Sequence, residues 1–309
     1  MNKEKFERHL IQNQIPFFKD KSMSEYTTLE LGGVAWYVIE AQDVSCVVTV
    51  KKLADEANMQ LIILGNGSNV LFRDKIFEGV VLVLAKQLNQ IEVIGNSVIA
   101  EAGASLKQVC EVACKNSLTG LEFAYGIPGT VGGAVYMNAG AFEGEVKDAV
   151  KEIDYLDEDG NLKNIHVQPK DFAYRKSIFT NTEKVILKVR FELLQGDYKT
   201  IRELMDRRLQ RRIDMQPLEY PSAGSVFKRP EGNYASALID QCGLKGKMCG
   251  GAMVSKKHAG FLINYDHASS NDFIELIEYV RKDVLEKTGY DLECEVKIIE
   301  NKRALGIKK

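Results

Sequence analysis

The sequence is poor in the residues that most often build metal sites and disulfide frameworks. Its 309 residues include only four histidines, and none of the six cysteines forms a C-x-x-C pair. Cys110 and Cys114 lie four residues apart on a predicted helix, a spacing that suits a metal ion. No histidine or further cysteine is near them in the sequence, so buried free thiols are the better interpretation. We therefore expect no metal site and a reducing environment.

The sequence also lacks an excess of charge of one sign and any long apolar run. A formal net charge of −2 argues against a dedicated nucleic-acid binder, which is usually strongly basic. No stretch approaches the roughly 20 apolar residues that span a bilayer, and the first residues, MNKEKFERHLIQNQ, lack the apolar centre of a signal peptide. We expect a cytoplasmic protein without membrane insertion or nucleic acid. Hydrophobic residues at 45% and charged residues at 27% are ordinary for a globular chain.

Glycine is concentrated in two segments. Tyr125–Ala141, YGIPGTVGGAVYMNAGA, carries five glycines and almost no charge, which is unusual for an exposed loop. Gly65–Asn69, GNGSN, follows a predicted strand. Glycine permits positive φ and close approach, and successive free N–H groups can bind phosphate. A buried crossover would also explain the longer segment. Together, the two segments favour one long ligand held between them, and a flavin dinucleotide has that shape.

The GNGSN segment resembles the front of the dinucleotide fingerprint G-x-G-x-x-G. Val70 stands where the third glycine would be, and no regular βαβ unit follows. A short anion-binding turn is therefore the better interpretation. Neither glycine-rich segment contains a histidine or cysteine, so we expect a non-covalently bound flavin.

The chain divides into three predicted parts. Residues 1–85 alternate helix and strand, beginning with an amphipathic helix over residues 1–20 that Pro16 ends, and residues 86–200 are richer in antiparallel hairpins. Residues 201–309 form the last part. The predicted strands and helices are Leu61–Gly65, Val80–Ala85, the hairpin Ile91–Gly103, a helix Ser105–Lys115, a hairpin turning at Asp159-Gly160, Val185–Leu194, a long helix after Asp197, a short helix Tyr234–Gly243, a closing helix and Glu295–Glu300.

The long helix after Asp197 carries apolar residues on one face and arginines largely elsewhere. A charged outer face is the default interpretation, and contact with phosphate is the alternative. The arginines are Arg202, Arg207, Arg208, Arg211 and Arg212.

Three polar residues in the second half suit a substrate with its own carboxylate. Arg175 can bind such a group through two parallel hydrogen bonds, Ser225 is a hydroxyl in a glycine-containing turn, and Glu295 begins the last strand. Taken singly, each residue has an ordinary structural explanation, namely a surface ion pair, a turn and a solvated strand position. Their spacing alone does not join them.

Six segments together resemble the UDP-N-acetylenolpyruvoylglucosamine reductases, also called UDP-N-acetylmuramate dehydrogenases, of bacterial peptidoglycan synthesis. The resemblance extends from about residue 27 to residue 300, and its specificity comes from the order and number of the motifs. They are LGNGSNVLF, GIPGTVGGAVYMNAGA, FAYRKSIF, PSAGSVFKRP, KHAGFLIN and ECEVKII.

The resemblance implies an α+β protein with a vanillyl-alcohol-oxidase-type (PCMH-type) two-part FAD-binding fold and a C-terminal α/β substrate-binding domain. It implies FAD as cofactor, NADPH as co-substrate and reduction of UDP-N-acetylglucosamine enolpyruvate, in a monomer or weak oligomer. Arg175, Ser225 and Glu295 match the family's catalytic residues, with Ser225 as proton donor. Tyr174, Lys228, Arg229 and His258 are candidate substrate contacts. The candidate cofactor contacts are Gly65, Asn66, Gly67, Ser68, Asn69, Tyr125, Gly126, Pro128, Gly129, Gly132, Gly133, Asn138, Gly140 and Ala141.

Two departures from the family pattern are visible. There is almost no room before Asp197 for the tyrosine-bearing loop that one branch folds over its substrate, so the chain resembles the shorter branch. Arg229 stands where that branch's pattern has asparagine.

The sequence leaves two other functions open. A flavin oxidase would consume oxygen without a UDP-sugar, and a flavin-binding sensor would be yellow but would not turn over NADPH.

Overall fold

The computed structural model describes residues 3–301. Its N-terminal part is built on a mixed sheet of order β1-β2-β5-β3, in which β2, β5 and β3 are parallel and β1 is antiparallel to β2. Asp43 caps α2 by accepting a hydrogen bond from the Cys46 N–H. The elements are α1 Lys3–Gln12, β1 Phe18–Ser22, β2 Val34–Glu40, α2 Val44–Ala57, β3 Gln60–Leu64, β4 Val70–Phe72 and β5 Phe77–Val83.

The middle part contains an antiparallel sheet of order β12-β11-β15-β7-β6. Both predicted hairpins are confirmed, with turns at Gly95-Asn96 and around Asp159-Gly160. The long strands and helices of this part are β6 Ile91–Ile94, β7 Ser97–Glu101, α3 Leu106–Lys115, α4 Val131–Tyr136, β11 Val150–Leu156, β12 Leu162–His166 and β15 Val185–Glu192.

Short two-residue pairings complete the middle part. β8 Leu118–Thr119 pairs with β16 Leu194–Gln195, and β9 Gly140–Ala141 pairs with β10 Gly144–Glu145. The segment expected to be irregular around Pro169–Phe179 contains a tight hairpin. Its strands are β13 Phe172–Ala173 and β14 Lys176–Ser177.

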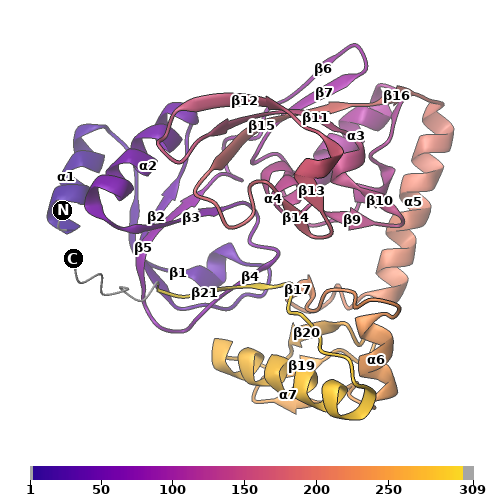
Figure 1. Cartoon of the computed structure of the whole chain (residues 1–309). Helices are drawn as coiled ribbons and strands as arrows, with labels where there is room; N and C mark the ends of the chain where they lie inside the picture. The colour runs from indigo at the N-terminus through magenta and orange to yellow at the C-terminus, as the bar shows by residue number, and fades with distance from the viewer. Residues whose placement is uncertain (1–2, 302–309) are drawn as a thin grey trace.

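The long helix α5, Tyr198–Met215, leads from the middle part to the C-terminal part (Figure 1). There a sheet of order β17-β20-β19-β18 packs on α7. The chain then returns, because β21 pairs in parallel with β4 of the N-terminal part. The elements are β17 Ser222–Ser225, α6 Ala235–Gln241, β18 Met248–Cys249, β19 Ala252–Val254, β20 Phe261–Asn264, α7 Ser270–Thr288 and β21 Lys297–Ile299.

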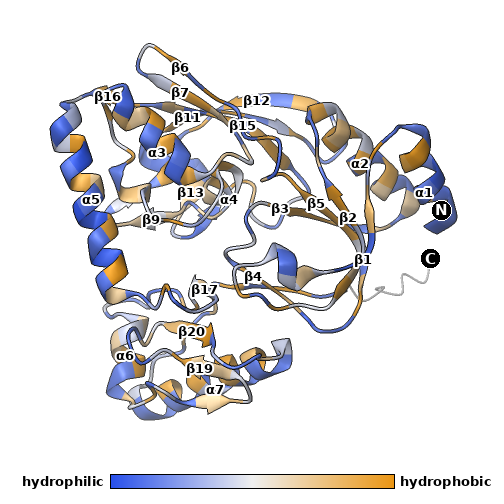
Figure 2. Ribbon diagram, turned by 180° about the vertical axis from the view of Figure 1, so that it is seen from behind, coloured by the Kyte–Doolittle hydropathy of each residue, from blue (hydrophilic) through white to orange (hydrophobic). Residues whose placement is uncertain are grey.

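Burial follows the predicted periodicity. In Figure 2, much of β2 and β5 has the orange of apolar residues, and most of α5 has the blue of polar ones. One core cluster spans the N-terminal and middle parts, and a second includes Leu29 and Leu71 together with residues 223–296. The division at residues 85 and 200 therefore cuts through a continuous core and through the start of α5. These two limits stay predictions.

Two local expectations are wrong. Residues 18–22 form a strand, because the chain beyond Pro16 pairs with the edge of β2 instead of continuing the first helix. The segment Tyr125–Ala141 is not one long loop, because α4 forms inside it. The Thr130 hydroxyl caps that helix by accepting a hydrogen bond from the Gly133 N–H.

Candidate functional site

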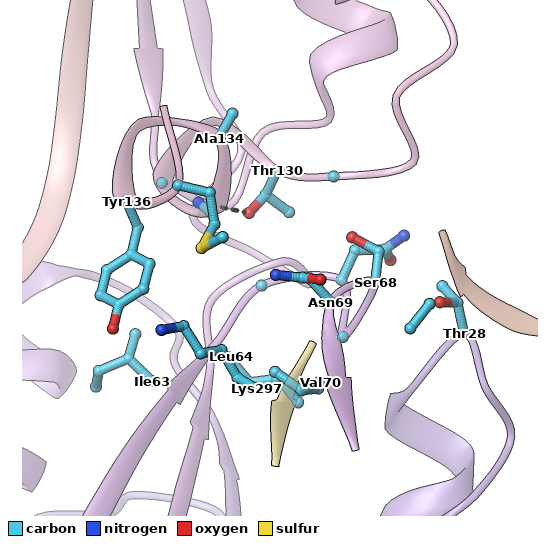
Figure 3. Close-up of a pocket in the computed structure, with 18 of the residues that line it drawn as sticks. Thr28, Ile63, Leu64, Ser68, Asn69, Val70, Thr130, Ala134, Tyr136 and Lys297 are labelled. Atoms are coloured by element: carbon cyan, nitrogen blue, oxygen red, sulfur yellow. Dashed lines mark hydrogen bonds between the residues drawn. The ribbon is translucent and has the colours of Figure 1, made fainter. Parts of the chain in front are cut away.

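A cavity of about 1870 Å³ runs between the N-terminal and middle parts and reaches the C-terminal part. Its walls come from the two glycine-rich segments, the β13–β14 hairpin, β17 and β21. In Figure 3, Tyr136 and Lys297 extend into this cavity from opposite sides, with Ser68 and Asn69 beside them. Five segments that are far apart in the sequence thus share one space.

The Gly65–Asn69 turn connects β3 to β4 and is tightly held. Gly67 has a φ of +63°, and a Cβ there would lie 2.0 Å from the Tyr26 carbonyl oxygen. Only glycine fits both the conformation and the space. The Asn66 side chain donates a 2.7 Å hydrogen bond to the Pro128 carbonyl, which joins this turn to the second glycine-rich segment. The two segments meet directly, as expected for walls around one ligand.

The glycines of the second segment differ in what surrounds them. A Cβ on Gly132 would lie 2.9 Å from the Ala102 Cβ, so this glycine is required by packing of the protein itself. A Cβ on Gly133 would meet nothing closer than the Thr130 Oγ1 at 3.6 Å. Gly133 therefore leaves its space to the cavity.

All the predicted cofactor residues line the cavity except Tyr125 and Asn138. The Tyr125 hydroxyl donates a 2.6 Å hydrogen bond to Glu111, and the ring is buried. Asn138 is fully buried and donates to the Ala173 carbonyl at 3.1 Å and to Glu145 at 3.2 Å. The polar groups of both side chains form hydrogen bonds within the protein, so these residues stabilise the cavity wall without lining it.

Arg175 and Glu295 form an ion pair at the cavity wall. The Arg175 Nε lies 2.9 Å from a Glu295 carboxylate oxygen, and the two side chains are 20% and 15% exposed. Arg175 also donates a 3.3 Å hydrogen bond to the Gly140 carbonyl of the second glycine-rich segment. Its φ of +56° is unusual for arginine and marks a strained turn between β13 and β14. The strained residue is thus the one whose guanidinium forms the ion pair with Glu295.

The environment of Glu295 shifts the pKa of its carboxyl. Burial raises the pKa of this carboxyl above its ordinary value, although the Arg175 charge acts in the opposite direction. The backbone on either side is fixed, since the Glu295 N–H donates to the Val226 carbonyl at 2.7 Å. The Glu295 carbonyl accepts a 3.3 Å hydrogen bond from the Asn69 side chain.

Ser225 stands beside this pair and faces the cavity. The pairing of β17 with β20 is interrupted between Ser222 and Ser225, and Gly224 has a φ of +74°. Ser225 pairs again with Phe261 after this irregularity, and its side chain is exposed and lines the cavity. Its neighbour Val226 accepts the Glu295 N–H, so the structure brings together the three predicted catalytic residues.

The four candidate substrate contacts do not line the cavity. The Tyr174 hydroxyl accepts a hydrogen bond from the Arg229 N–H at 3.1 Å, and Lys228 forms a 2.6 Å ion pair with Glu293. The Arg229 guanidinium stacks on Tyr234, 4.1 Å from the ring centroid. His258 accepts the Gly260 N–H on Nδ1, and burial lowers the pKa of its imidazole. Their contact with a substrate stays a prediction.

Sequence reasoning missed two cations of the cavity lining. The last strand, predicted to begin at Glu295, begins at Lys297, which lies two residues after Glu295 and lines the same cavity. Burial lowers the pKa of Lys297. Arg212 is not on a charged outer face, because its guanidinium is largely buried and donates a 2.8 Å hydrogen bond to the Gly126 carbonyl. Nothing in the sequence distinguished it from the neighbouring arginines.

Arg202 also departs from the outer-face expectation. Its guanidinium pairs with Glu111 of α3 and stacks on Tyr125, 5.6 Å from the ring centroid. This contact holds α5 against the middle part, away from the cavity. Arg207 and Arg211 are exposed, as expected.

Two further observations concern metals and membranes. Within residues 3–301, no group of three or more His, Cys, Asp or Glu side chains is arranged to hold a metal ion. Across the same range, no helix combines the length and the apolar character that crossing a bilayer requires.

Comparison with known proteins gives consistent matches over nearly the whole chain. Residues 35–166 match the FAD binding domain family, and residues 216–299 match the C-terminal domain of UDP-N-acetylenolpyruvoylglucosamine reductase. The UDP-N-acetylenolpyruvoylglucosamine reductase of Geobacillus kaustophilus is 47% identical over 281 residues, which cover 91% of this chain and 92% of that protein.

Solved structures give the same result. The crystal structure of UDP-N-acetylenolpyruvylglucosamine reductase from Thermus caldophilus superposes with a TM-score of 0.78 at 31% identity, covering 93% of this chain and 99% of that one. A glucose oxidase variant of Phl p 4 superposes with a TM-score of 0.50 at 15% identity over 63% of this chain and 44% of that one. This second similarity concerns the fold alone, which is the vanillyl-alcohol-oxidase type expected from the sequence.

Proposed function

The chain belongs to the family of UDP-N-acetylenolpyruvoylglucosamine reductases, and we propose that it uses NADPH to reduce UDP-N-acetylglucosamine enolpyruvate to UDP-N-acetylmuramate. It is an FAD-dependent oxidoreductase of peptidoglycan precursor synthesis. NADPH is the proposed reductant, and Arg175, Ser225 and Glu295 are the proposed catalytic residues. It also places the reaction in the cytoplasm, where NADPH and UDP-sugars are available, and expects a monomer or a weak oligomer.

The residues of the cavity fit a bound flavin dinucleotide. No protein atom fills the space next to the Gly133 Cα. The Gly65–Asn69 turn contacts the Tyr125–Ala141 segment through the Asn66–Pro128 hydrogen bond. Glycine backbone can approach a flat ring or a pyrophosphate where side chains would collide. When bound, FAD accepts two electrons from NADPH and passes them to the substrate. Arg212 and Lys297 supply positive charge for the anionic parts of the ligands.

The single observation that carries the proposal is the meeting of Arg175, Glu295 and Ser225 at one wall of this cavity. The substrate's enolpyruvyl group ends in a carboxylate. When the methylene carbon is reduced, negative charge moves into that carboxylate and makes an enediolate. The Arg175 guanidinium stabilises this charge because it is already in place and partly shielded from water.

Glu295 orients Arg175 through the ion pair between its carboxylate and the Arg175 Nε. Burial raises the pKa of this carboxyl, although the Arg175 charge acts against the shift. An unpaired carboxylate beside the enediolate would repel it, so the pairing with Arg175 suits the charged intermediate. Glu295 is therefore a positioning group.

Ser225 completes the reaction by protonating the neighbouring carbon. Its hydroxyl faces the cavity, so it can give its proton to the enediolate and recover one from solvent. Serine is a weak acid, and the step depends on a strongly basic intermediate and on close positioning. The balance is one NADPH and one proton consumed for each enolpyruvyl ether converted to a lactyl ether.

The test separates the two half-reactions by stopped flow. We expect Ser225→Ala to leave flavin reduction by NADPH nearly intact and to slow reoxidation by the enolpyruvyl UDP-sugar about 10²–10⁴-fold, the usual contribution of a general acid. Flavin reduction is the internal control, because Ser225 takes no part in it. Unchanged reoxidation in Ser225→Ala would remove Ser225 from the mechanism.

A further inference from the structure

Thr28 lies between the first glycine-rich turn and the strand that carries Ser225. It belongs to the short segment that joins the N-terminal strands β1 and β2, and it lines the cavity next to Ser68 and Asn69 (Figure 3). None of the sequence motifs drew attention to it. Its hydrogen bonds reach both the Gly65–Asn69 turn and β17.

On one side, Thr28 contacts the Gly65–Asn69 turn, which is called the cofactor turn from here on. The Thr28 N–H donates a 3.2 Å hydrogen bond to the Gly67 carbonyl. The same turn touches the preceding residues without any free space, since a Cβ on Gly67 would lie 2.0 Å from the Tyr26 carbonyl oxygen and 2.8 Å from the Thr27 Cα. A displacement of the turn would therefore push directly on this segment.

On the other side, Thr28 contacts β17. The Thr28 carbonyl accepts a 3.0 Å hydrogen bond from the Ser222 N–H, and the Thr28 hydroxyl donates a 2.6 Å hydrogen bond to the Ser222 carbonyl. Ser222 is the last paired residue before the irregularity that precedes Ser225. β17 is the outer strand of its sheet, and Ser222 pairs with Ile263 of β20 on one side, so the bonds from Thr28 hold its open edge next to the irregular stretch.

We propose that Thr28 is a positioning residue that fixes the Ser225 hydroxyl relative to the cofactor turn. The inference rests on the proposed role of Ser225 as proton donor. Proton transfer depends steeply on distance and alignment, whereas flavin reduction by NADPH does not use Ser225. Loss of the Thr28 hydroxyl therefore slows one half-reaction and spares the other.

Glu295 is held to the same turn in a parallel way. The Asn69 side chain donates to the Glu295 carbonyl at 3.3 Å, and the Lys297 N–H donates to the Asn69 carbonyl at 3.0 Å. The Gly65–Asn69 turn thus contacts β17 through Thr28, and it contacts Glu295 and the start of β21 through Asn69. Thr28 is the better residue to test, because Asn69 is itself a candidate cofactor contact.

The experiment compares Thr28→Val with Thr28→Ser in the FAD-loaded enzyme. Valine keeps the β-branched shape and both backbone hydrogen bonds but removes the donor to Ser222, whereas serine keeps the donor. We expect Thr28→Val to slow reoxidation by the enolpyruvyl UDP-sugar about three- to tenfold, the equivalent of one hydrogen bond. Its solvent deuterium isotope effect should rise, while flavin reduction and flavin content stay at wild-type values. Thr28→Ser should restore reoxidation.

Thr27→Val is the matched control. The Thr27 hydroxyl donates a 2.9 Å hydrogen bond to the Leu31 carbonyl within the same segment and does not reach β17. This variant should lower the melting temperature without separating the two half-reactions. Amide hydrogen exchange gives a readout independent of turnover, since residues 222–226 should exchange faster in Thr28→Val than in Thr27→Val.

Three results would overturn the proposal: unchanged reoxidation in Thr28→Val, equal slowing of both half-reactions, or a Thr28→Ser variant as slow as Thr28→Val. Failure of the proposed function is a separate outcome. It would appear as a wild-type flavin that NADPH reduces but the enolpyruvyl UDP-sugar does not reoxidise, whereas normal reoxidation in Ser225→Ala would remove only the assumed role of Ser225.

Discussion

The two sides of the cavity are built in opposite ways. The glycine-rich side comes from two segments that are each continuous in sequence, and it offers backbone and empty space, as at Gly133. The catalytic side is assembled from three distant segments, and it offers charge and a hydroxyl from Arg175, Glu295 and Ser225. One side defines where a ligand lies, and the other defines what happens to it.

The difference predicts how each side fails. Substitution on the glycine-rich side adds atoms where none fit, so the first loss is binding of FAD. Substitution on the catalytic side removes charge or a proton donor, so the first loss is rate with the cofactor still bound. Flavin content and rate therefore separate the two sides experimentally.

After Ser225, the largest effect in this comparison is expected for Arg175. Arg175→Gln removes the charge that faces the developing enediolate and should slow reoxidation by the UDP-sugar about 10²–10³-fold, the range seen when a preorganised electrostatic group is lost. Flavin content, read from absorbance after purification, should remain near the wild-type value. Loss of FAD in parallel with rate would contradict the division between the two sides.

Arg202 provides the control for Arg175. It forms a comparable arginine–carboxylate pair with Glu111, but this pair lies outside the cavity lining. Arg202→Gln should lower thermal stability, because Glu111 and Tyr125 lose a partner, without changing either half-reaction.

A smaller effect is expected for Gly133, on the other side. Gly133→Val places a branched side chain in the space left for the ligand and should weaken FAD binding about 10- to 100-fold, the equivalent of 1–3 kcal/mol of overpacking. Equilibrium titration of the flavin-depleted variant with FAD measures this change. Gly132→Val tests the contrast, because its side chain meets Ala102 and should destabilise the fold as well. Full flavin content in purified Gly133→Val would be evidence against the proposed cofactor surface.

The smallest effect concerns His258, which belongs to the C-terminal part but not to the cavity lining. Burial lowers the pKa of its imidazole, so its stabilising contribution is present above the ordinary value of about 6.5 and is lost as the pH falls toward the lower pKa of the folded state. The unfolding free energy of the wild type should therefore decrease more between pH 7.5 and pH 5.5 than that of His258→Gln. Urea denaturation at the two pH values measures the difference. A larger decrease in the variant would reverse the assigned direction.

Much of the architecture follows from local sequence. The hairpin over residues 91–103 and the apolar strand β5 were both predicted, because turn chemistry and periodicity act within a few residues. Strand β1 was missed because Phe18–Ser22 is partly exposed and has no regular alternation, and only the edge of β2 makes it a strand. Helix α4 was missed because glycine is a poor helix former and the Thr130 cap was not recognised.

The sequence by itself determined the family, the cofactor class and the positions of the glycine-rich turns, because each is written in contiguous residues. The tertiary structure decided which side chains share the cavity. It paired Arg175 with Glu295, turned Tyr125 and Asn138 away, buried Arg212 against Gly126 and inserted Thr28 between the cofactor turn and the Ser225 strand. These contacts join residues far apart in the chain, and their formation depends on packing that no local pattern encodes.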